Sequence, residues 1–302
     1  MSHSLFHNFL STISLFIPRI TFFGQKSEPT EIAIEPDTTI VSKIMSKNYE
    51  LYLSFPKGYS SKDTIKYPVL YVLDGSNSIA LIKSIFESTD VTTELEDVII
   101  VGISSGRELV SLGVNRTNDY TTSTDAIWDR QYEKDAAKQY KLPYNALKGE
   151  IQSGGAAKFL QCITTEIIPY IDSHYKTTNE RGISGHSLGG LFTAWCFINT
   201  KGIFTRYGIN SPSLWWKNDE VIAQAETFFS NHKTLDIPET KIFISVGQKE
   251  PSNMILVMEK FSSLLESKAY KNVAVTKQQF IGKSHLSVID PGLKQTLSVL
   301  YG

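Results

Sequence analysis

Apolar and polar positions follow one another along this chain in two different rhythms. Short, nearly continuous apolar runs rich in β-branched and aromatic residues are typical of strands buried on both faces of a parallel sheet. We predict strands at Thr39–Met45, Tyr49–Phe55, Tyr67–Leu73, Asp97–Ile103, Arg181–Ser184, Tyr207–Ile209, Lys241–Val246 and Val273–Phe280. Apolar residues at helical spacing predict helices at Ile79–Glu87, Ala156–His174, Leu188–Asn199, Glu220–Ser230, Ser252–Ala269 and Leu286–Leu300. This alternation indicates an α/β fold, with a mostly parallel central sheet flanked by helices on both faces.

One long segment departs from this alternation. No core element is recognisable in residues 104–155, and a loop of that length inside a compact domain is usually functional. The segment mixes charges with rings, among them Arg116, Trp128 and Tyr132. We therefore predict one α/β domain over residues 38–302, in which this segment is a lid-like insertion that covers the mouth of the site and selects the substrate.

The first 37 residues have a different composition. Leu5–Phe23 is mostly apolar, but Pro18 and polar residues interrupt it, so it is a poor candidate for a spanning helix. It also lacks the basic start and small-residue cleavage site of a secretory signal. We predict a loosely attached tail that ends in a polar linker at Ser27–Asp37, with a signal peptide or membrane-proximal anchor as the alternative. A simple tail would favour a cytoplasmic protein, whereas a signal peptide would imply a secreted or periplasmic protein.

Charge and cysteine content exclude several classes of partner. The chain has 302 residues and a formal net charge of -1, which favours neither a nucleic acid nor an anionic membrane surface as partner. Cys162 and Cys196 are too few for a disulfide framework and are expected to be small buried hydrophobes. No Cys-x-x-Cys spacing occurs, and the one His-x-x-x-His spacing, His3 and His7, lies in the first 37 residues, so we expect neither a metal nor another cofactor.

The strongest chemical signal is the pentapeptide Gly185-His186-Ser187-Leu188-Gly189. It fits G-x-S-x-G between a short apolar strand and an apolar helix, which is the context of a nucleophile elbow. In that turn the serine is exposed in strained geometry, and the glycines leave room for the tight bend. The pattern predicts Ser187 as a nucleophile.

A serine hydroxyl needs a base to act as a nucleophile. In enzymes with such an elbow, the order of the catalytic residues along the chain is serine, acid, histidine. Only His232 and His285 follow Ser187. His232 lies in a polar stretch, whereas His285 lies between the last strand and the last helix, so we predict His285 as the base. Glu250 follows a strand and is the first candidate for the acid. The alternatives are Asp290 and a Ser–His dyad with no acid.

Attack of a serine on a carbonyl group creates a negatively charged oxygen, the oxyanion, which two backbone N–H groups should stabilise. The N–H of Leu188 opens the helix after the nucleophile, where the positive end of the helix dipole lies. The second donor should come from the loop after the Tyr67–Leu73 strand, either from Ser76 or from Gly75.

Several segments beyond the elbow carry a family resemblance that runs in register from about residue 40 to the C-terminus. They are Tyr71–Gly75, Val101–Ile103, Arg116 with Asp119–Thr121, Gly154–Leu160, Ile168–Ile171, Arg181–Leu191, Ser211–Trp216 and Gly282–His285. On these the chain resembles the esterase family that includes enterochelin esterases, siderophore trilactone hydrolases and esterase D. Where many relatives continue Asp-Tyr-Thr-Pro, this chain has Thr122.

The resemblance implies an α/β-hydrolase fold and a serine esterase that works through an acyl-enzyme on a small-molecule ester, such as the trilactone of a catecholate siderophore. We also expect substrate contacts from Arg116, in the long segment, and from Trp215. Arg116 is the candidate for an anionic or catecholate group, because its planar fork binds oxygens in pairs. The alternative is an ion pair with Asp119 that only shapes the loop. An acyltransferase of the same fold and a non-catalytic binding relative are the rival functions.

Overall fold

The structure is a computed structural model that describes residues 34–62, 64–87, 95–106 and 109–302. The predicted apolar segment of the tail and most of its linker lie outside the described residues. The last linker residue already belongs to the fold, because the Asp37 N–H donates to the Leu51 carbonyl and the Asp37 carboxylate accepts from the Leu53 N–H.

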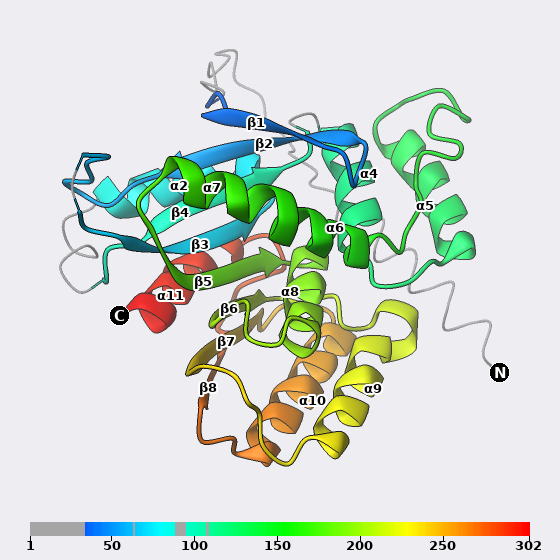
Figure 1. Cartoon of the computed structure of the whole chain (residues 1–302). Coiled ribbons are helices and arrows are strands. Elements are labelled where there is room, and N and C mark those ends of the chain that lie inside the picture. Colours follow the sequence, from blue (N-terminus) through cyan, green and yellow to red (C-terminus); the bar gives the residue numbers. More distant parts are fainter. Residues whose placement is uncertain (1–33, 63, 88–94, 107–108) are drawn as a thin grey trace.

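In the described part of the chain, eight strands form one sheet with the order β1-β2-β4-β3-β5-β6-β7-β8 (Figure 1). The strands are β1 (Thr38–Ser42), β2 (Lys47–Ser54), β3 (Tyr67–Leu73), β4 (Ile99–Ser104), β5 (Thr177–His186), β6 (Arg206–Asn210), β7 (Thr240–Gly247) and β8 (Val273–Phe280). β2 pairs antiparallel with both β1 and β4, and every pairing from β4 to β8 is parallel. Each predicted strand corresponds to one of these strands, so the sequence pattern located the sheet.

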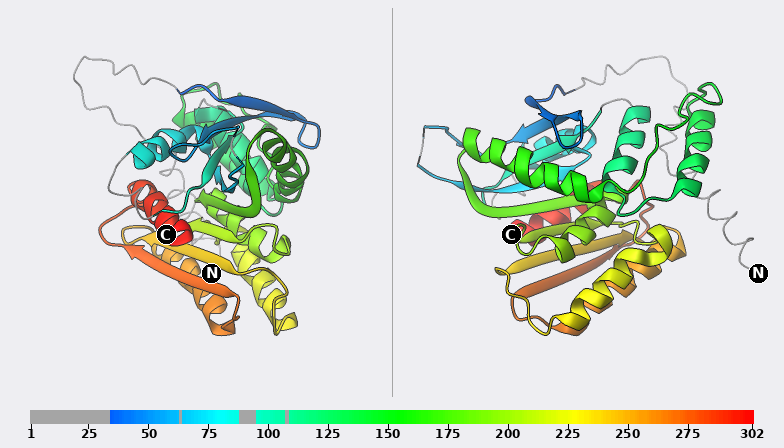
Figure 2. Two further views of the ribbon diagram at one scale, coloured as in Figure 1. Left: turned by 60° about the vertical axis from the view of Figure 1, so that its left-hand side comes forward. Right: turned by 45° about the vertical axis from the view of Figure 1, so that its right-hand side comes forward.

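Helices cover both faces of the sheet. They are α2 (Gly75–Glu87), α4 (Leu109–Tyr120), α5 (Ala126–Gln139), α6 (Ala156–Cys162), η1 (Ile163–Ile167), α7 (Ile168–His174), α8 (Leu188–Asn199), α9 (Trp216–Asn231), α10 (Ser252–Lys268) and α11 (Ile289–Tyr301). Figure 2 shows α2 and α11 on one face and α6 to α10 on the other. The buried side chains form a corresponding core on each face: β3 directs Tyr71 into the core under α6 to α10 and Leu70 into the core under α2 and α11. The predicted mostly parallel α/β sheet, flanked on both faces, is therefore confirmed.

The segment over residues 104–155 differs from its prediction, because it contains two helices, α4 and α5. Both lie beyond the end of the sheet toward which the β5 arrow points in Figure 1. The helical pattern of α4 was hidden because its buried positions include Thr117 and Asp119, which are polar. Each of these finds a hydrogen-bond partner inside the protein, and apolar periodicity does not register such a helix.

Two other helices also differ from their predicted form. The predicted helix Ala156–His174 contains a π-helical turn at Ile163–Ile167, followed by a proline, Pro169, at the start of α7. Proline has no N–H to donate within a helix, so a change of hydrogen-bonding pattern here is expected. In α9, residues 217–219 have positive φ and interrupt the helix after Trp216.

Among the residues that the structure describes, none of the helices is both long and apolar enough to cross a membrane. Cys162 and Cys196 are both buried and unbridged.

Candidate active site

Ser187 stands at the turn between β5 and α8 with φ 62° and ψ −116°. Few L-residues adopt such a conformation, and it persists only where the surroundings enforce it. Two close approaches explain the flanking glycines: a Cβ on Gly185 would lie 2.5 Å from Gly189, and one on Gly190 would lie 2.7 Å from the Asn210 carbonyl oxygen. Hydrogen bonds fix the turn, because the Ser187 N–H donates to that same carbonyl at 3.0 Å. The local geometry is that of a nucleophile elbow.

His285 and Glu250 form a buried pair beyond the ends of β8 and β7. The Nδ1 atom of His285 lies 2.7 Å from Oε2 of Glu250, and the Glu250 side chain is fully buried. The other carboxylate oxygen, Oε1, accepts from the Ser211 hydroxyl at 2.6 Å and from the Gly247 N–H at 2.7 Å. These bonds satisfy a carboxylate that would otherwise be costly to bury, and they orient it toward the imidazole. Asp290, the rival acid, is exposed in the first turn of α11.

Ser187 and His285 line one pocket of about 380 Å³. Its walls come from the ends of β3, β5 and β6, from α2 and α11, and from the segment over residues 104–155. They include Asp74, Asn77, Leu112, Arg116, Tyr132, Tyr140, His186, Asn210, Leu286 and Asp290. The Ser187 hydroxyl has the Ser213 hydroxyl 3.3 Å away, and the Ser213 N–H donates to the Ser187 carbonyl at 3.0 Å. The pocket therefore gives the serine and histidine access to the same ligand.

A polar network under the elbow was not predicted from the sequence. Asn210 ends β6, and its side chain donates to Thr296 at 3.0 Å and accepts from Ser245 at 2.8 Å. Its backbone carbonyl is the acceptor that fixes the Ser187 N–H. An asparagine at the end of a short strand carries no distinctive motif, so no sequence signal identified it. The network fixes the position of β6 relative to the nucleophile.

The second unpredicted residue is His186, which occupies a variable position of the pentapeptide. Its ring packs against that of His285, with the centroids 4.4 Å apart. Burial lowers the pKa of His186 well below its usual value, and the charges of His285 and Arg116 act in the same direction. His186 is therefore neutral at physiological pH.

The two expected oxyanion donors open two helices at the pocket. Leu188 is the first residue of α8, and Ser76 is the second residue of α2, after Gly75. The residues before these helices, Ser187 and Asp74, both line the pocket. Since the first N–H groups of a helix have no partner within it, both helix starts direct N–H groups and positive dipole ends to this region. The Ser76 hydroxyl itself lies 2.9 Å from that of Ser104.

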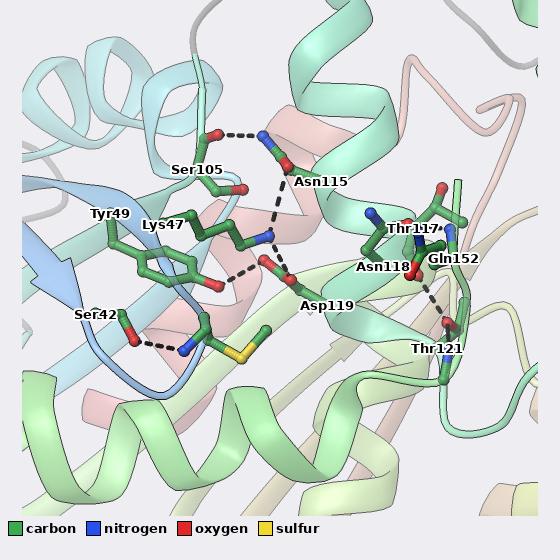
Figure 3. A network of polar contacts seen from close by, with 12 residues as sticks. Ser42, Lys47, Tyr49, Ser105, Asn115, Thr117, Asn118, Asp119, Thr121 and Gln152 are labelled. Carbon is green, nitrogen blue, oxygen red and sulfur yellow. Dashed lines mark hydrogen bonds and ion pairs between the residues drawn. The ribbon is translucent and has the colours of Figure 1, made fainter. Parts of the chain in front are cut away.

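Arg116 lies in α4 and lines the pocket, as a substrate contact would require. The alternative partner predicted for it, Asp119, is wrong. The guanidinium instead binds the Asp74 carboxylate through Nε at 3.2 Å and Nη2 at 3.0 Å. Asp119 lies on another side of α4, where Lys47 and Tyr49 bind it (Figure 3). Positions three apart on a helix point in directions about 60° apart, so Arg116 and Asp119 meet different neighbours.

Trp215, the second expected substrate contact, does not line the pocket. It is half-buried at the start of α9 and packs against the hydrophobic core. Its neighbour Trp216 is fully buried and contacts Trp128 of α5 edge-on, with ring centroids 5.0 Å apart. Trp216 therefore helps to hold α5 in place, and α5 contributes Tyr132 to the pocket.

An elbow serine and a buried histidine–carboxylate pair at the carboxyl ends of parallel strands define the class: this is a serine hydrolase with the α/β-hydrolase fold. Comparison with known proteins agrees. The family model described as "Putative esterase" matches residues 42–285. The chain belongs to this esterase family and is a carboxylic ester hydrolase.

Named relatives cover most of the chain. The ferri-bacillibactin esterase BesA of Bacillus subtilis is 26% identical over 82% of this chain and 83% of its own length. The apo-salmochelin esterase of Escherichia coli is 24% identical over 85% of this chain and 76% of its own. Among solved structures, the BES protein from Bacillus cereus superposes with a TM-score of 0.72 at 26% identity, covering 88% of this chain and 95% of that one.

Proposed function

We propose that this protein hydrolyses a siderophore trilactone or a closely related ester, with Ser187 as nucleophile, His285 as base and Glu250 as the carboxylate that orients the base. The observation that carries this proposal is that the strained serine and the buried histidine–carboxylate pair line one pocket. The names of the relatives support the substrate class, since both curated relatives above are siderophore esterases.

The proposed reaction has two steps through an acyl-enzyme. His285 takes the Ser187 proton while Oγ attacks the ester carbonyl, and the N–H groups of Leu188 and Ser76 or Gly75 stabilise the resulting oxyanion. His285 then protonates the leaving alkoxide, which departs as the alcohol. In the second step His285 activates water, which releases the acid and restores Ser187. The Glu250 carboxylate holds Nδ1 protonated, so that Nε2 is the nitrogen that exchanges protons.

The pocket also supports a substrate larger than a short acyl ester. Its walls carry the rings of Tyr132 and Tyr140, and the exposed apolar side chain of Leu286 follows the base. Tyrosine side chains supply flat apolar area together with a polar tip, which suits aromatic groups such as catechols.

A substrate panel tests this proposal. It compares p-nitrophenyl acetate and butyrate with a catecholate siderophore trilactone, and follows opening of the lactone ring by mass spectrometry. We expect kcat/KM for the trilactone to exceed that for the short esters by at least about tenfold, equivalent to ~1.4 kcal/mol of additional transition-state binding. Equal or lower kcat/KM on the trilactone would contradict the substrate class. Transfer of the acyl group to an added alcohol in preference to water would instead indicate an acyltransferase.

A further inference from the structure

The two turns that carry the oxyanion donors follow β3 and β5, beyond the last paired residues of these strands. Strand pairing alone therefore does not fix the distance between the two turns. β3 and β5 are neighbours, but their pairing ends at Val72 and Ser184. The turn after β3 and the elbow after β5 both continue past this last pair. Their separation decides whether both N–H groups reach one carbonyl oxygen, so another contact between the two turns would matter for catalysis.

Arg116 makes that contact. Its guanidinium binds the Asp74 carboxylate at 3.2 and 3.0 Å, and its Nη2 also donates to the His186 carbonyl at 3.2 Å. Asp74 immediately precedes α2, and His186 immediately precedes Ser187. One planar side chain therefore links the residue just before each of the two turns that supply oxyanion donors.

The turn at Asp74 has an uncommon and crowded backbone conformation. Asp74 has φ 55°, in the left-handed region, and a Cβ on the following Gly75 would lie 2.4 Å from Gly102. Tyr120, four residues after Arg116 on α4, accepts the Asp74 N–H at 3.3 Å, and its ring lies 5.7 Å from the guanidinium. The Asp74 carbonyl in turn accepts a hydrogen bond from the Asn77 N–H at 3.0 Å. Every polar group of Asp74 therefore has a hydrogen-bond partner.

The charges of the pair are matched. Burial alone would lower the pKa of Arg116, but the Asp74 carboxylate and its hydrogen bonds outweigh burial and raise it. The guanidinium therefore stays charged, and its fork faces Asp74 with the geometry that makes arginine–carboxylate pairs strong.

We propose that Arg116 is a positioning residue for the oxyanion hole, which fixes the separation of the two donor turns through Asp74 and the His186 carbonyl. This inference rests on the proposed function, because it assumes that the Ser187 reaction passes through an oxyanion. It differs from a substrate contact, in which Arg116 would bind an anionic or catecholate group and leave the turnover of small neutral esters unchanged.

A comparison of an ester with its thiono analogue separates these roles. The C=S sulfur accepts hydrogen bonds weakly, so a working oxyanion hole favours the oxygen ester, and a damaged one loses that preference. The variants are Arg116→Met and the near-isosteric Asp74→Asn, with the exposed Arg130→Met as matched control. Each is assayed on a neutral acetyl ester, its thiono analogue and a siderophore trilactone, and melting temperatures are recorded.

We expect Arg116→Met to lower kcat on the neutral oxygen ester roughly 10²-fold, the size of effect seen when an oxyanion donor is lost. The oxygen-to-thiono rate ratio should fall by at least about tenfold, Asp74→Asn should move it the same way, and Arg130→Met should leave it unchanged. If Arg116→Met does not fold, Asp74→Asn decides the matter.

Two results would overturn this inference. One is an unchanged kcat on the neutral ester with a raised KM for the trilactone, which would make Arg116 a substrate contact. The other is an equal loss on oxygen and thiono esters, which would mean that the residue supports the fold without setting the oxyanion hole. Failure of the proposed function is a separate outcome, recognised by ester turnover that survives in a Ser187→Ala variant.

Discussion

At the scale of single residues, the fold places the Glu250 carboxylate against the ring of His285. Glu250 and His285 are 35 residues apart in sequence, yet Nδ1 and Oε2 lie 2.7 Å apart in a buried setting. The sequence left Asp290 open as a rival, although it lies only five residues past His285. In the structure Asp290 belongs to the exposed first turn of a helix.

Replacing Glu250 by glutamine should keep the shape of the site and remove the negative charge that holds the imidazole. Loss of the corresponding acid in well-studied proteases lowers kcat by roughly 10⁴-fold, and we expect a loss of about 10³-fold or more here. Asp290→Asn, the matched control, should stay close to wild type. Steady-state kinetics on a neutral ester measure both. The reverse order would make Asp290 the acid, and two near-normal variants would indicate a Ser–His dyad.

His186 should make the protein sensitive to mild acid. Burial lowers the pKa of His186 in the folded state. Below about pH 6.5 this histidine is therefore protonated in the unfolded chain but stays neutral in the folded protein. Stability is then lost as the pH falls through that range, by at most about 1.4 kcal/mol per pH unit. We expect His186→Gln to reduce the loss of melting temperature between pH 7 and pH 5. The exposed His174→Gln serves as control. A His186 variant as acid-sensitive as wild type would refute the assignment.

At the scale of elements, α4 is the helix that connects the edge of the sheet to the pocket. One side presents Arg116 to the turn after β3, and another presents the fully buried Asp119 to the β1–β2 hairpin. Figure 3 shows Lys47 and Tyr49 of β2 reaching this carboxylate, at 2.6 and 2.8 Å. The strands and the apolar helices were predictable because burial leaves a periodic apolar pattern. This helix was not, because the groups that it buries are polar and are satisfied by partners distant in the chain.

Lys47→Met should destabilise the protein by leaving the buried Asp119 carboxylate without its cation. We expect a cost of about 2–3 kcal/mol, below the usual 3–5 kcal/mol for a fully buried pair because Lys47 is partly exposed. Burial already raises the pKa of Asp119 in the folded protein. A raised carboxyl pKa makes the folded protein less stable as the pH rises through that pKa. The deficit should therefore be full at neutral pH and shrink in acid. Urea unfolding at two pH values measures this, with the exposed Lys134→Met as control. A deficit independent of pH would contradict the account of Asp119.

At the scale of the whole molecule, the site is assembled from segments that only the complete sheet brings together. Ser187, His285 and Glu250 all lie beyond the carboxyl ends of parallel strands, which is where open α/β sheets collect functional groups. Knowledge of that topology made Ser187, His285 and Glu250 predictable as candidates. The Asn210 network and the partner of Arg116 were not, because they depend on which side chains meet across the sheet, and one sequence does not carry that information.

The most direct test of a serine esterase with Ser187 as nucleophile is covalent labelling. The folded protein is treated with a fluorophosphonate, and the modified residue is located by mass spectrometry while ester hydrolysis is followed in parallel. We expect stoichiometric labelling of Ser187, with loss of activity in step with labelling. Ser187→Ala should be unlabelled and folded, with kcat reduced by roughly 10⁵- to 10⁶-fold. Ser213→Ala, which removes only the neighbouring hydroxyl, should still be labelled at Ser187. Labelling at another residue, or a Ser187→Ala variant that retains activity within about tenfold of wild type, would contradict the central claim.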